Sequence, residues 1–316
     1  MRLEDYAPRP AHIRWLLDSD PSIRWQVMRD LTGEAPDAIA AERSRVAVEG
    51  WGGQLLARQL ADGSWGGGQW DLVTLWSLVV LKDLGLDPAS DQARIMIDRV
   101  DKGLVFKPLN NRPFLHGETE PCINGRILGV GTYFKEPNDA LAEQLLAEQL
   151  EDGGWNCEAP GSRRSSFHTT ICVLEGLLEY ERAGRKSAAI TEARERAENY
   201  LLERRMFRSL RTGEVIDKHW RRFSFPMFWH YDVLRGLDYL RDAGIKPDSR
   251  VDEAIRIVME RRHQNGRWPL NVLHRERIPL EMETGVGKAS RWNTLRALRV
   301  LRWYGHASAI AGDDRR

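Results

Sequence analysis

One short motif occurs three times along the chain, and this repeat constrains the fold more than any single residue does. The copies are 59–65 (QLADGSW), 149–155 (QLEDGGW) and a looser 263–268 (HQNGRW). Each copy follows a segment with helical periodicity, and another such segment comes after it. Self-similarity of this kind is typical of repeat architectures, in which each unit buries its apolar face against the next one.

Apolar residues recur with the period of a helix, about 3.6 residues, in segments that end at or near a glycine. Glycine at the end of a helix supplies the left-handed conformation that caps it. The strongest segments are 74–85 (TLWSLVVLKDLG), 171–184 (ICVLEGLLEYERAG), 233–244 (VLRGLDYLRDAG) and 294–305 (TLRALRVLRWYG), and weaker copies are 127–134 (ILGVGTYF) and 23–33 (IRWQVMRDLTG). Between them lie more charged helical stretches, which we expect to face outward: 38–48, 55–60, 89–99, 140–150, 191–202 and 251–262.

These patterns predict an all-α fold, because no alternating β-type segment competes with the helices. Helix pairs of about 50 residues give about five to six pairs, and closing them into an α/α toroid (a barrel) leaves no exposed end. We expect one toroid over 1–305. The charged residues 306–316 predict a disordered tail.

The motif has a structural role in such an array. Gly63, Gly153 and Gly266 permit a tight turn between an outer and an inner helix. The tryptophan packs an apolar face over the helix ends. The amide groups of Gln59 and Gln149 can bond to the backbone at a helix end.

Bulk composition excludes several classes of partner. The formal net charge is +1, so no global field favours nucleic acid. The longest apolar stretch, 72–81, is too short for a transmembrane segment, and 1–10 lacks the apolar run of a signal peptide. Three cysteines, Cys122, Cys157 and Cys172, do not make a disulfide framework. We therefore expect a cytoplasmic protein with reduced thiols.

The pattern Q-x-x-D-G-(S/G)-W in 59–65 and 149–155 resembles the QW motif of squalene cyclases and related triterpene cyclases. It is also similar to the corresponding turns of protein prenyltransferase β subunits. The third copy departs from it, with Arg262 in place of the glutamine and Asn265 in place of the acid. The resemblance implies an α/α barrel whose central hydrophobic cavity binds an isoprenoid or another small apolar ligand, as in a terpenoid cyclase or a prenyltransferase-like enzyme.

The reaction is left open by two motifs that the sequence lacks. Cyclases that protonate an alkene carry a D-x-D-D acid motif, and ionising terpene synthases carry D-D-x-x-D, which holds magnesium on a diphosphate. Neither occurs in this chain. An alternative to the enzyme is therefore a non-catalytic, ligand-binding toroid that lacks the cyclase acid.

Zinc is implied by the comparison with prenyltransferases. In that family an Asp-x-Cys precedes a helix, a Tyr-His-Thr follows the glycine-rich turn, and the Asp, Cys and His bind zinc. This chain has 120–122 (EPC) and 167–169 (FHT) in the same order. The resemblance implies Glu120, Cys122 and His168 as metal ligands, although the acid is Glu and a proline intervenes.

The helical register places two of these residues together independently of the family. Cys122 lies six residues before Leu128, and His168 lies six residues before Leu174. Both are thus expected at the N-terminal ends of neighbouring inner helices, where three ligands would leave one zinc position open for a substrate. The structural alternative is that Cys122 is a small buried hydrophobe and His168 caps a helix. The other cysteines are alternative ligands: Cys157 and Cys172.

A second group of candidate residues lies in 203–232, which lengthens one repeat. Its cations could hold a diphosphate or another anion, and they are Lys218, His219, Arg221 and Arg222. Asp232, beside His230 and Tyr231, is the candidate general acid, because an apolar pocket would raise its pKa. The alternative is a solvated basic loop over packed aromatic residues.

Carbohydrate-active α/α barrels are the third class that the sequence leaves open. These enzymes stack tryptophan on sugars and use two carboxylates for the chemistry. The candidates for such a pair are Asp71, Glu118, Glu120, Asp232 and Glu283. The Q-x-x-D-G-(S/G)-W turns argue against this class, because they belong to the isoprenoid families.

Overall fold

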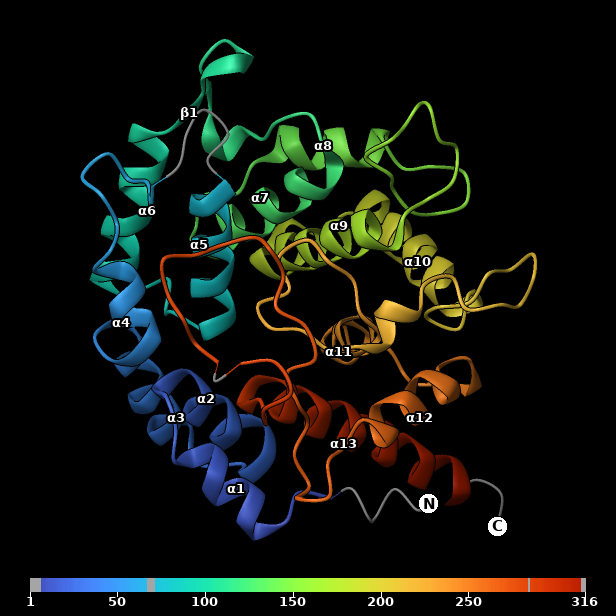
Figure 1. Ribbon diagram of the computed structural model, residues 1–316. Helices are drawn as coiled ribbons and strands as arrows, with labels where there is room; N and C mark the ends of the chain where they lie inside the picture. The colour runs from blue at the N-terminus through green and yellow to red at the C-terminus, as the bar shows by residue number, and fades with distance from the viewer. Residues whose placement is uncertain (1–6, 67–71, 284, 314–316) are drawn as a thin grey trace.

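The computed structural model describes residues 7–66, 72–283 and 285–313, and this part of the protein is mostly helical (Figure 1). The expected all-α class is confirmed. A short antiparallel ladder, β1 (Val105–Phe106) with β2 (Arg112–Pro113), lies between two of the helices. The α-helices are α1 (Pro10–Leu17), α2 (Pro21–Val27), α3 (Pro36–Ser44), α4 (Gly50–Leu56), α5 (Leu72–Leu84), α6 (Asp91–Gly103), α7 (Pro121–Tyr133), α8 (Asp139–Ala147), α9 (Phe167–Tyr180), α10 (Ala188–Glu203), α11 (Val233–Asp242), α12 (Asp252–Glu260) and α13 (Arg291–Asp313). None of the described helices is both long and apolar enough to cross a lipid bilayer.

Two kinds of helix alternate along the chain, as the sequence predicts. Helix α7 is buried at every position from Pro121 to Thr132. By contrast, α6 buries one stripe, formed by Ala93, Met96, Ile97 and Val100, and every residue of α3 is at least partly exposed. We call α2, α5, α7, α9, α11 and α13 the central helices; Figure 1 shows the others outside them.

Each central helix contacts the next one along the chain, and the last contacts the first. Helix α5 packs on α7, α7 on α9, α11 on α13, and α13 on α2. The indole N–H of Trp25 in α2 donates to the Leu84 carbonyl in α5 at 2.9 Å. Arg235 in α11 binds Glu175 in α9 through two hydrogen bonds of 2.8 Å.

Small residues bring α7 and α9 into direct backbone contact. A Cβ atom at Gly125 would lie only 2.6 Å from the Cys172 carbonyl oxygen, and one at Gly176 would collide with the backbone of Gly125. Only glycine permits this approach. The first turns of the two helices, which carry Cys122 and His168, are therefore neighbours, as the register predicted.

The structural role of the repeated motif is confirmed. Its glycines have φ of 80° to 97°, which is left-handed backbone. Gln59 and Gln149 each donate to two backbone carbonyls, one in their own turn and one in a neighbouring helix. The indole N–H of each tryptophan donates to a carbonyl in the preceding helical segment, from Trp65 to Leu55, Trp155 to Leu145 and Trp268 to Val258. The backbone N–H of each tryptophan donates to a threonine of the next central helix, namely Thr74, Thr170 or Thr294.

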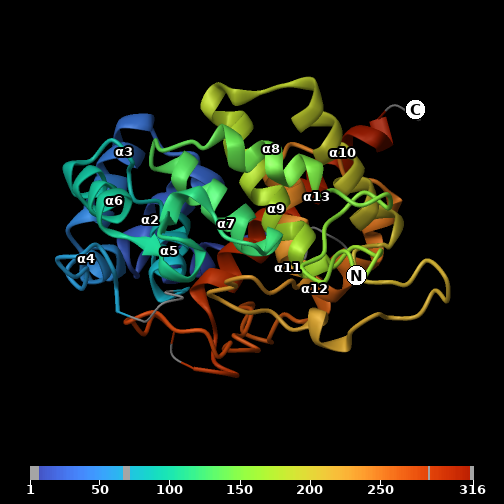
Figure 2. The same ribbon diagram turned by 90° about the horizontal axis from the view of Figure 1, so that it is seen from above.

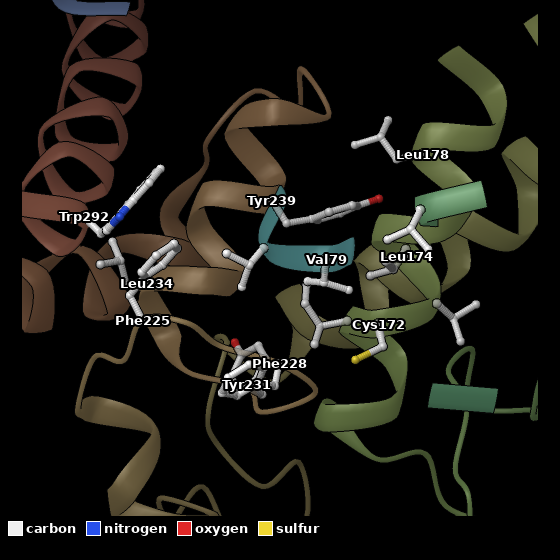
Figure 3. Close-up of a cluster of buried hydrophobic side chains, with 14 of the residues drawn as sticks. Val79, Cys172, Leu174, Leu178, Phe225, Phe228, Tyr231, Leu234, Tyr239 and Trp292 are labelled. Atoms are coloured by element: carbon white, nitrogen blue, oxygen red, sulfur yellow. The ribbon is translucent and has the colours of Figure 1, made fainter. Parts of the chain in front are cut away.

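Aromatic side chains from the segment before α11 fill the middle of the molecule. Phe225, Phe228 and Tyr231 are buried, and Figure 3 shows them among side chains of α9, α11 and α13. Phe225 stacks on Trp292 of α13 with ring centroids 4.3 Å apart. Arg126 of α7 donates to the Phe228 carbonyl at 2.9 Å, so a buried arginine side chain holds the backbone of this segment. Two cavities lie at the ends of these central helices.

The structure shifts several of the expected boundaries, among them the start of α7, which lies at Pro121 where the segment 127–134 was expected. Helix α4 covers Gly50–Leu56, where 55–60 was expected, and its Gly52 approaches the backbone of Val46 too closely for any side chain. Helix α13 runs to Asp313, into the range 306–316 expected to form a tail, and 314–316 lie outside the described residues. Disorder there remains a prediction.

Candidate functional site

A pocket of about 740 Å³ opens at the first turns of α5, α7 and α9, and we call it the N-terminal pocket. The loops before α11 and α13 lie on one side of the helices in Figure 2, and Trp229 of the first of these loops belongs to the pocket wall. One wall is apolar, formed by Leu72, Trp76, Ile123 and Trp229. The polar part of the lining, here called the polar wall, includes Glu118, Glu120, Cys122, Cys157, His168 and Thr169.

Two thiols and a carboxylate converge on the polar wall. Pro121 starts α7, Cys122 is its second residue, and Glu120 is the preceding cap residue. Cys157 comes from the loop that follows the second repeated motif. The ligand atoms of Glu120, Cys122 and Cys157 all lie within 4.8 Å of one another. All three cysteines of the chain are free thiols, so this pair is available for chemistry.

The Cys122 thiol has two acceptors within reach, a Glu120 carboxylate oxygen at 3.5 Å and the Cys157 sulfur. The hydrogen bond to Cys157, together with burial, raises the pKa of the Cys122 thiol. The same bond lowers the pKa of Cys157, because a thiolate there accepts the proton of Cys122. The Cys157 sulfur also lies 3.4 Å from the Thr169 hydroxyl. Cys157 is thus the thiol that ionises first, and thiolate is the form that binds metals.

His168 lines the same pocket, but its ring nitrogens point away from the thiols. Nδ1 accepts a hydrogen bond of 2.8 Å from the backbone N–H of Tyr231, and Nε2 lies 3.4 Å from the indole nitrogen of Trp220. Burial, with His230 nearby, lowers the pKa of His168 to about 4, so the ring is neutral near pH 7. Of the predicted set, Glu120 and Cys122 lie together, and Cys157 stands where His168 was expected.

The predicted general acid, Asp232, serves as the N-terminal cap of a helix. Its carboxylate caps α11 by accepting from the backbone N–H of Arg235 at 2.8 Å, and it also accepts from Ser224. Burial raises its pKa, as expected, although Arg296 opposes the shift. Tyr231 donates its hydroxyl to the Met206 carbonyl at 2.7 Å. Among the residues that the structure describes along the N-terminal pocket, neither Asp232 nor Tyr231 is present.

The predicted anion-binding cations lie on the surface. Lys218 and His219 are exposed on a short 3-10 turn, and Asp217 caps this turn and binds the His219 ring at 2.7 Å. Arg222 is exposed, Arg221 is half-buried, and within the described part of the chain neither belongs to the N-terminal pocket. Trp220 between them is buried against Phe167. This arrangement matches the alternative of a solvated basic loop over packed aromatic residues.

Of the described carboxylates considered for a sugar enzyme, Glu118 and Glu120 share one pocket, whereas Asp232 and Glu283 are not among its lining residues. Asp71 lies outside the described residues. Glu118 and Glu120 line the N-terminal pocket, but the Glu118 carboxylate accepts from the backbone N–H groups of the two residues that follow it. Glu283 accepts a 2.6 Å hydrogen bond from Ser290 near the start of α13. Asp232 is the capping residue described above.

His230 belongs to a group that the sequence analysis missed. Its Nε2 lies 3.0 Å from both carboxylate oxygens of Glu276, and its ring stacks on His274 at 3.6 Å. Burial and the neighbouring His230 lower the pKa of His274 to about 4. His274 and Glu276 come from the loop before α13, which has no helical or strand periodicity. The only sequence feature that could have indicated this group is the His-x-Glu spacing of His274 and Glu276, which is a weak indicator of a site.

A second pocket, of about 380 Å³, lies at the other end of the same helices, and we call it the C-terminal pocket. Its wall is dominated by charged side chains, among them Lys82, Asp83, Glu175, Arg235, Asp238 and Arg299. Most of these charges are paired. Glu175 binds Arg126 and Arg235, and Asp238 binds Arg241 at 2.8 Å and Arg299 at 3.2 Å.

No protein-family model matches the chain, and a search of curated proteins finds no similar sequence. A fold alone does not fix an activity, so the function has to be inferred from the geometry of the site.

Proposed function

We propose that the central helices close into an α/α toroid whose N-terminal pocket binds a small apolar ligand beside a zinc ion. The observation that carries this proposal is the convergence of Glu120, Cys122 and Cys157 in a pocket that apolar side chains also line. The class of protein is the terpenoid cyclase and prenyltransferase-like toroid to which the sequence motifs point.

The order of contacts supports the toroid. Each central helix touches the next one along the chain, and α13 returns to α2 through packing and through the 2.9 Å bond from Arg299 to Gln26. The amphipathic helices α6, α10 and α12 bury a stripe and expose the rest, as outer helices of a toroid should.

The donor chemistry supports zinc. Two cysteine sulfurs and one carboxylate are a suitable ligand set for Zn²⁺, and three protein ligands leave a fourth position open. Among the described residues that line the pocket none is Lys or Arg, while Glu118, Glu120 and Glu158 add negative charge to the thiols. A divalent cation would supply the missing positive charge. When bound there, zinc would act as a Lewis acid or hold a thiolate substrate.

The same lining indicates the kind of ligand. Trp76, Ile123 and Trp229 offer apolar surface, and without lysine or arginine in the described wall a diphosphate would be repelled by the acids. The proposal is therefore a neutral isoprenoid or similar apolar molecule. The basic residues Lys218 and Arg222 stand apart from this pocket and take no part in the proposal.

Zinc content tests the metal half of the proposal. Purified wild-type protein, without a histidine tag, is compared by elemental analysis with Cys122→Ala and Cys157→Ala. We expect each variant to hold about one equivalent less than wild type, because either loss leaves too few strong ligands. Cys172→Ala is the matched control, since this cysteine lies outside the thiol pair. Equal zinc in all four proteins would contradict the site.

Calorimetry with farnesol and with farnesyl diphosphate tests the ligand half. We expect farnesol to bind more tightly, and Trp229→Ala to weaken its binding through lost apolar contact. Binding without zinc would favour the non-catalytic, ligand-binding toroid. Tighter binding of the diphosphate, or of a neutral oligosaccharide, would contradict the proposed ligand class.

A further inference from the structure

We infer that His230, His274 and Glu276 form a second metal site, one that binds a divalent transition metal through nitrogen and oxygen ligands. Their ligand atoms all lie within 4.8 Å of one another, in a partly buried position. The site goes beyond the proposed function, because it shares no ligand with the thiol site and does not depend on it.

The distances fit two ligands of one metal ion as well as the direct hydrogen bond that joins His230 and Glu276. His230 Nε2 lies 3.0 Å from each carboxylate oxygen of Glu276. Neighbouring ligands of a tetrahedral zinc with bonds of about 2.0–2.1 Å lie about 3.3–3.4 Å apart. A metal between His230 and Glu276 therefore needs only a small displacement of either side chain. Two imidazoles and one carboxylate suit Zn²⁺, Fe²⁺, Co²⁺ or Ni²⁺.

The third ligand is available. Within the described part of the chain, Nε2 of His274 is buried and has no hydrogen-bond partner. A buried polar nitrogen left unpaired costs about 1–3 kcal/mol, which a bound metal would remove. The His274 ring lies parallel to the His230 ring at 3.6 Å, and a small rotation would direct both toward one ion.

The surroundings orient these ligands as the outer shell of a metal site does. The Trp229 indole N–H donates to a Glu276 oxygen at 2.5 Å, and its ring stacks on His230 with centroids 3.9 Å apart. Arg235 fixes the His230 backbone through a 2.6 Å bond to its carbonyl. Such hydrogen bonds to ligating groups position them and tune the metal.

The site would join two separate loops. His230 belongs to the loop before α11, whereas His274 and Glu276 belong to the loop before α13. Because Trp229 bonds to Glu276 and also lines the N-terminal pocket, metal binding would fix one wall of that pocket. Metal at this position would therefore order the ligand pocket without contacting the ligand.

Isothermal calorimetry with Co²⁺ tests the inference. The parent is the full chain with Cys122→Ser and Cys157→Ser, without a histidine tag, so that the thiol site is removed. We expect one equivalent of Co²⁺ to bind, and the absorption spectrum of the complex should lack the thiolate-to-cobalt band. His274→Ala should weaken binding at least tenfold. Trp229→Phe should weaken it about tenfold through the lost bond to Glu276.

The control is His116→Ala, which removes an exposed histidine outside both clusters. Circular dichroism and thermal unfolding of every variant show whether it is folded. Unchanged Co²⁺ affinity in a folded His274→Ala variant, or an absence of binding to the parent, would overturn the inference. Neither result bears on zinc at the thiols, which is measured with the cysteine variants.

Discussion

The N-terminal and C-terminal pockets lie at opposite ends of the same helices, and they differ in how their polar groups are satisfied. At the C-terminal end, Glu175 lies between Arg126 and Arg235, and Asp238 between Arg241 and Arg299. At the N-terminal end, the two thiols lie beside each other and beside the Glu120 carboxylate, and the described lining holds neither lysine nor arginine. Paired charges join helices, whereas thiols and carboxylates with no described cation beside them leave coordination chemistry open.

The pKa shifts of Glu175, Asp238 and Cys122 follow from these different partners. Burial disfavours the charged form of Glu175, but Arg126 and Arg235 outweigh it and lower the pKa to about 2. The pKa of Asp238 is lowered for the same reason by its arginines. In the N-terminal pocket, the hydrogen bond with Cys157 and burial raise the pKa of Cys122. At the C-terminal end, the Glu175 carboxylate thus joins α9 to α7 and α11 through its two arginines.

Removing the charge of Glu175 should cause the largest loss of stability. Glu175→Gln leaves the guanidinium groups of Arg126 and Arg235 buried, with side chains 4% and 1% exposed, without their counterion. Because the Glu175 side chain is itself 21% exposed, we expect the low end of the range for a broken buried pair, about 3 kcal/mol. Urea unfolding measures this. Glu179→Gln is the control, since Glu179 lies 3.8 Å from Lys82 and should cost under about 1 kcal/mol.

Zinc should stabilise a protein whose thiol pair is intact and should not stabilise the Cys157→Ser variant. At free zinc near 100 times Kd, a metal that binds only the folded state adds about 2.7 kcal/mol to the free energy of unfolding. Urea unfolding with and without zinc measures the difference, with Cys172→Ser as the control. To isolate the thiols, His274→Ala is included in every protein. Equal stabilisation of the Cys157→Ser and control proteins would place the zinc elsewhere.

Acid should remove the stability that the ionised Glu175 contributes at the C-terminal end. The pKa of Glu175 is about 2 when folded and near 4.5 when unfolded. Its contribution is therefore fully present above the unfolded pKa and is lost as pH falls from about 4.5 toward 2. Linkage predicts a loss of about 1 kcal/mol by about pH 3.5. Wild type should lose this amount relative to Glu175→Gln, and parallel pH profiles of the two proteins would refute the assignment.

The smallest effect is expected at the exposed basic loop. Lys218→Ala should change stability by less than about 0.5 kcal/mol, because its side chain is exposed. Arg222→Ala should cost up to about 1 kcal/mol, because it also removes the 2.9 Å hydrogen bond to the Asn271 carbonyl. Neither should alter the binding of farnesol. A marked loss of farnesyl diphosphate binding in these variants, measured by calorimetry, would instead restore the loop as an anion site.

The sequence predicted the helices well because their signals are local. The period of the apolar residues located α5, α9 and α11, and the glycines of the motif marked the turns. The equal spacing of Cys122 and His168 from their aligned leucines placed both at the second position of neighbouring helices. Periodicity and capping depend on a few adjacent residues, so they can be read without knowing the fold.

The composition of the site was less predictable because it depends on loops. Cys157 joins the thiol pair from a turn, and His168 is drawn away by a backbone N–H of Tyr231, 63 residues distant. Asp232 has the raised pKa that was expected, but the carboxylate is used to cap α11. A sequence shows which side chains are available, whereas the long-range packing of the loop before α11 decides which way they point.

A crystal structure of the zinc-loaded protein, with anomalous scattering recorded at the zinc absorption edge, tests the central claim most directly. The account predicts an anomalous peak about 2.3 Å from the sulfurs of both Cys122 and Cys157, with Glu120 as a further ligand. A disulfide between the two cysteines, or thiols with no zinc between them, would contradict it.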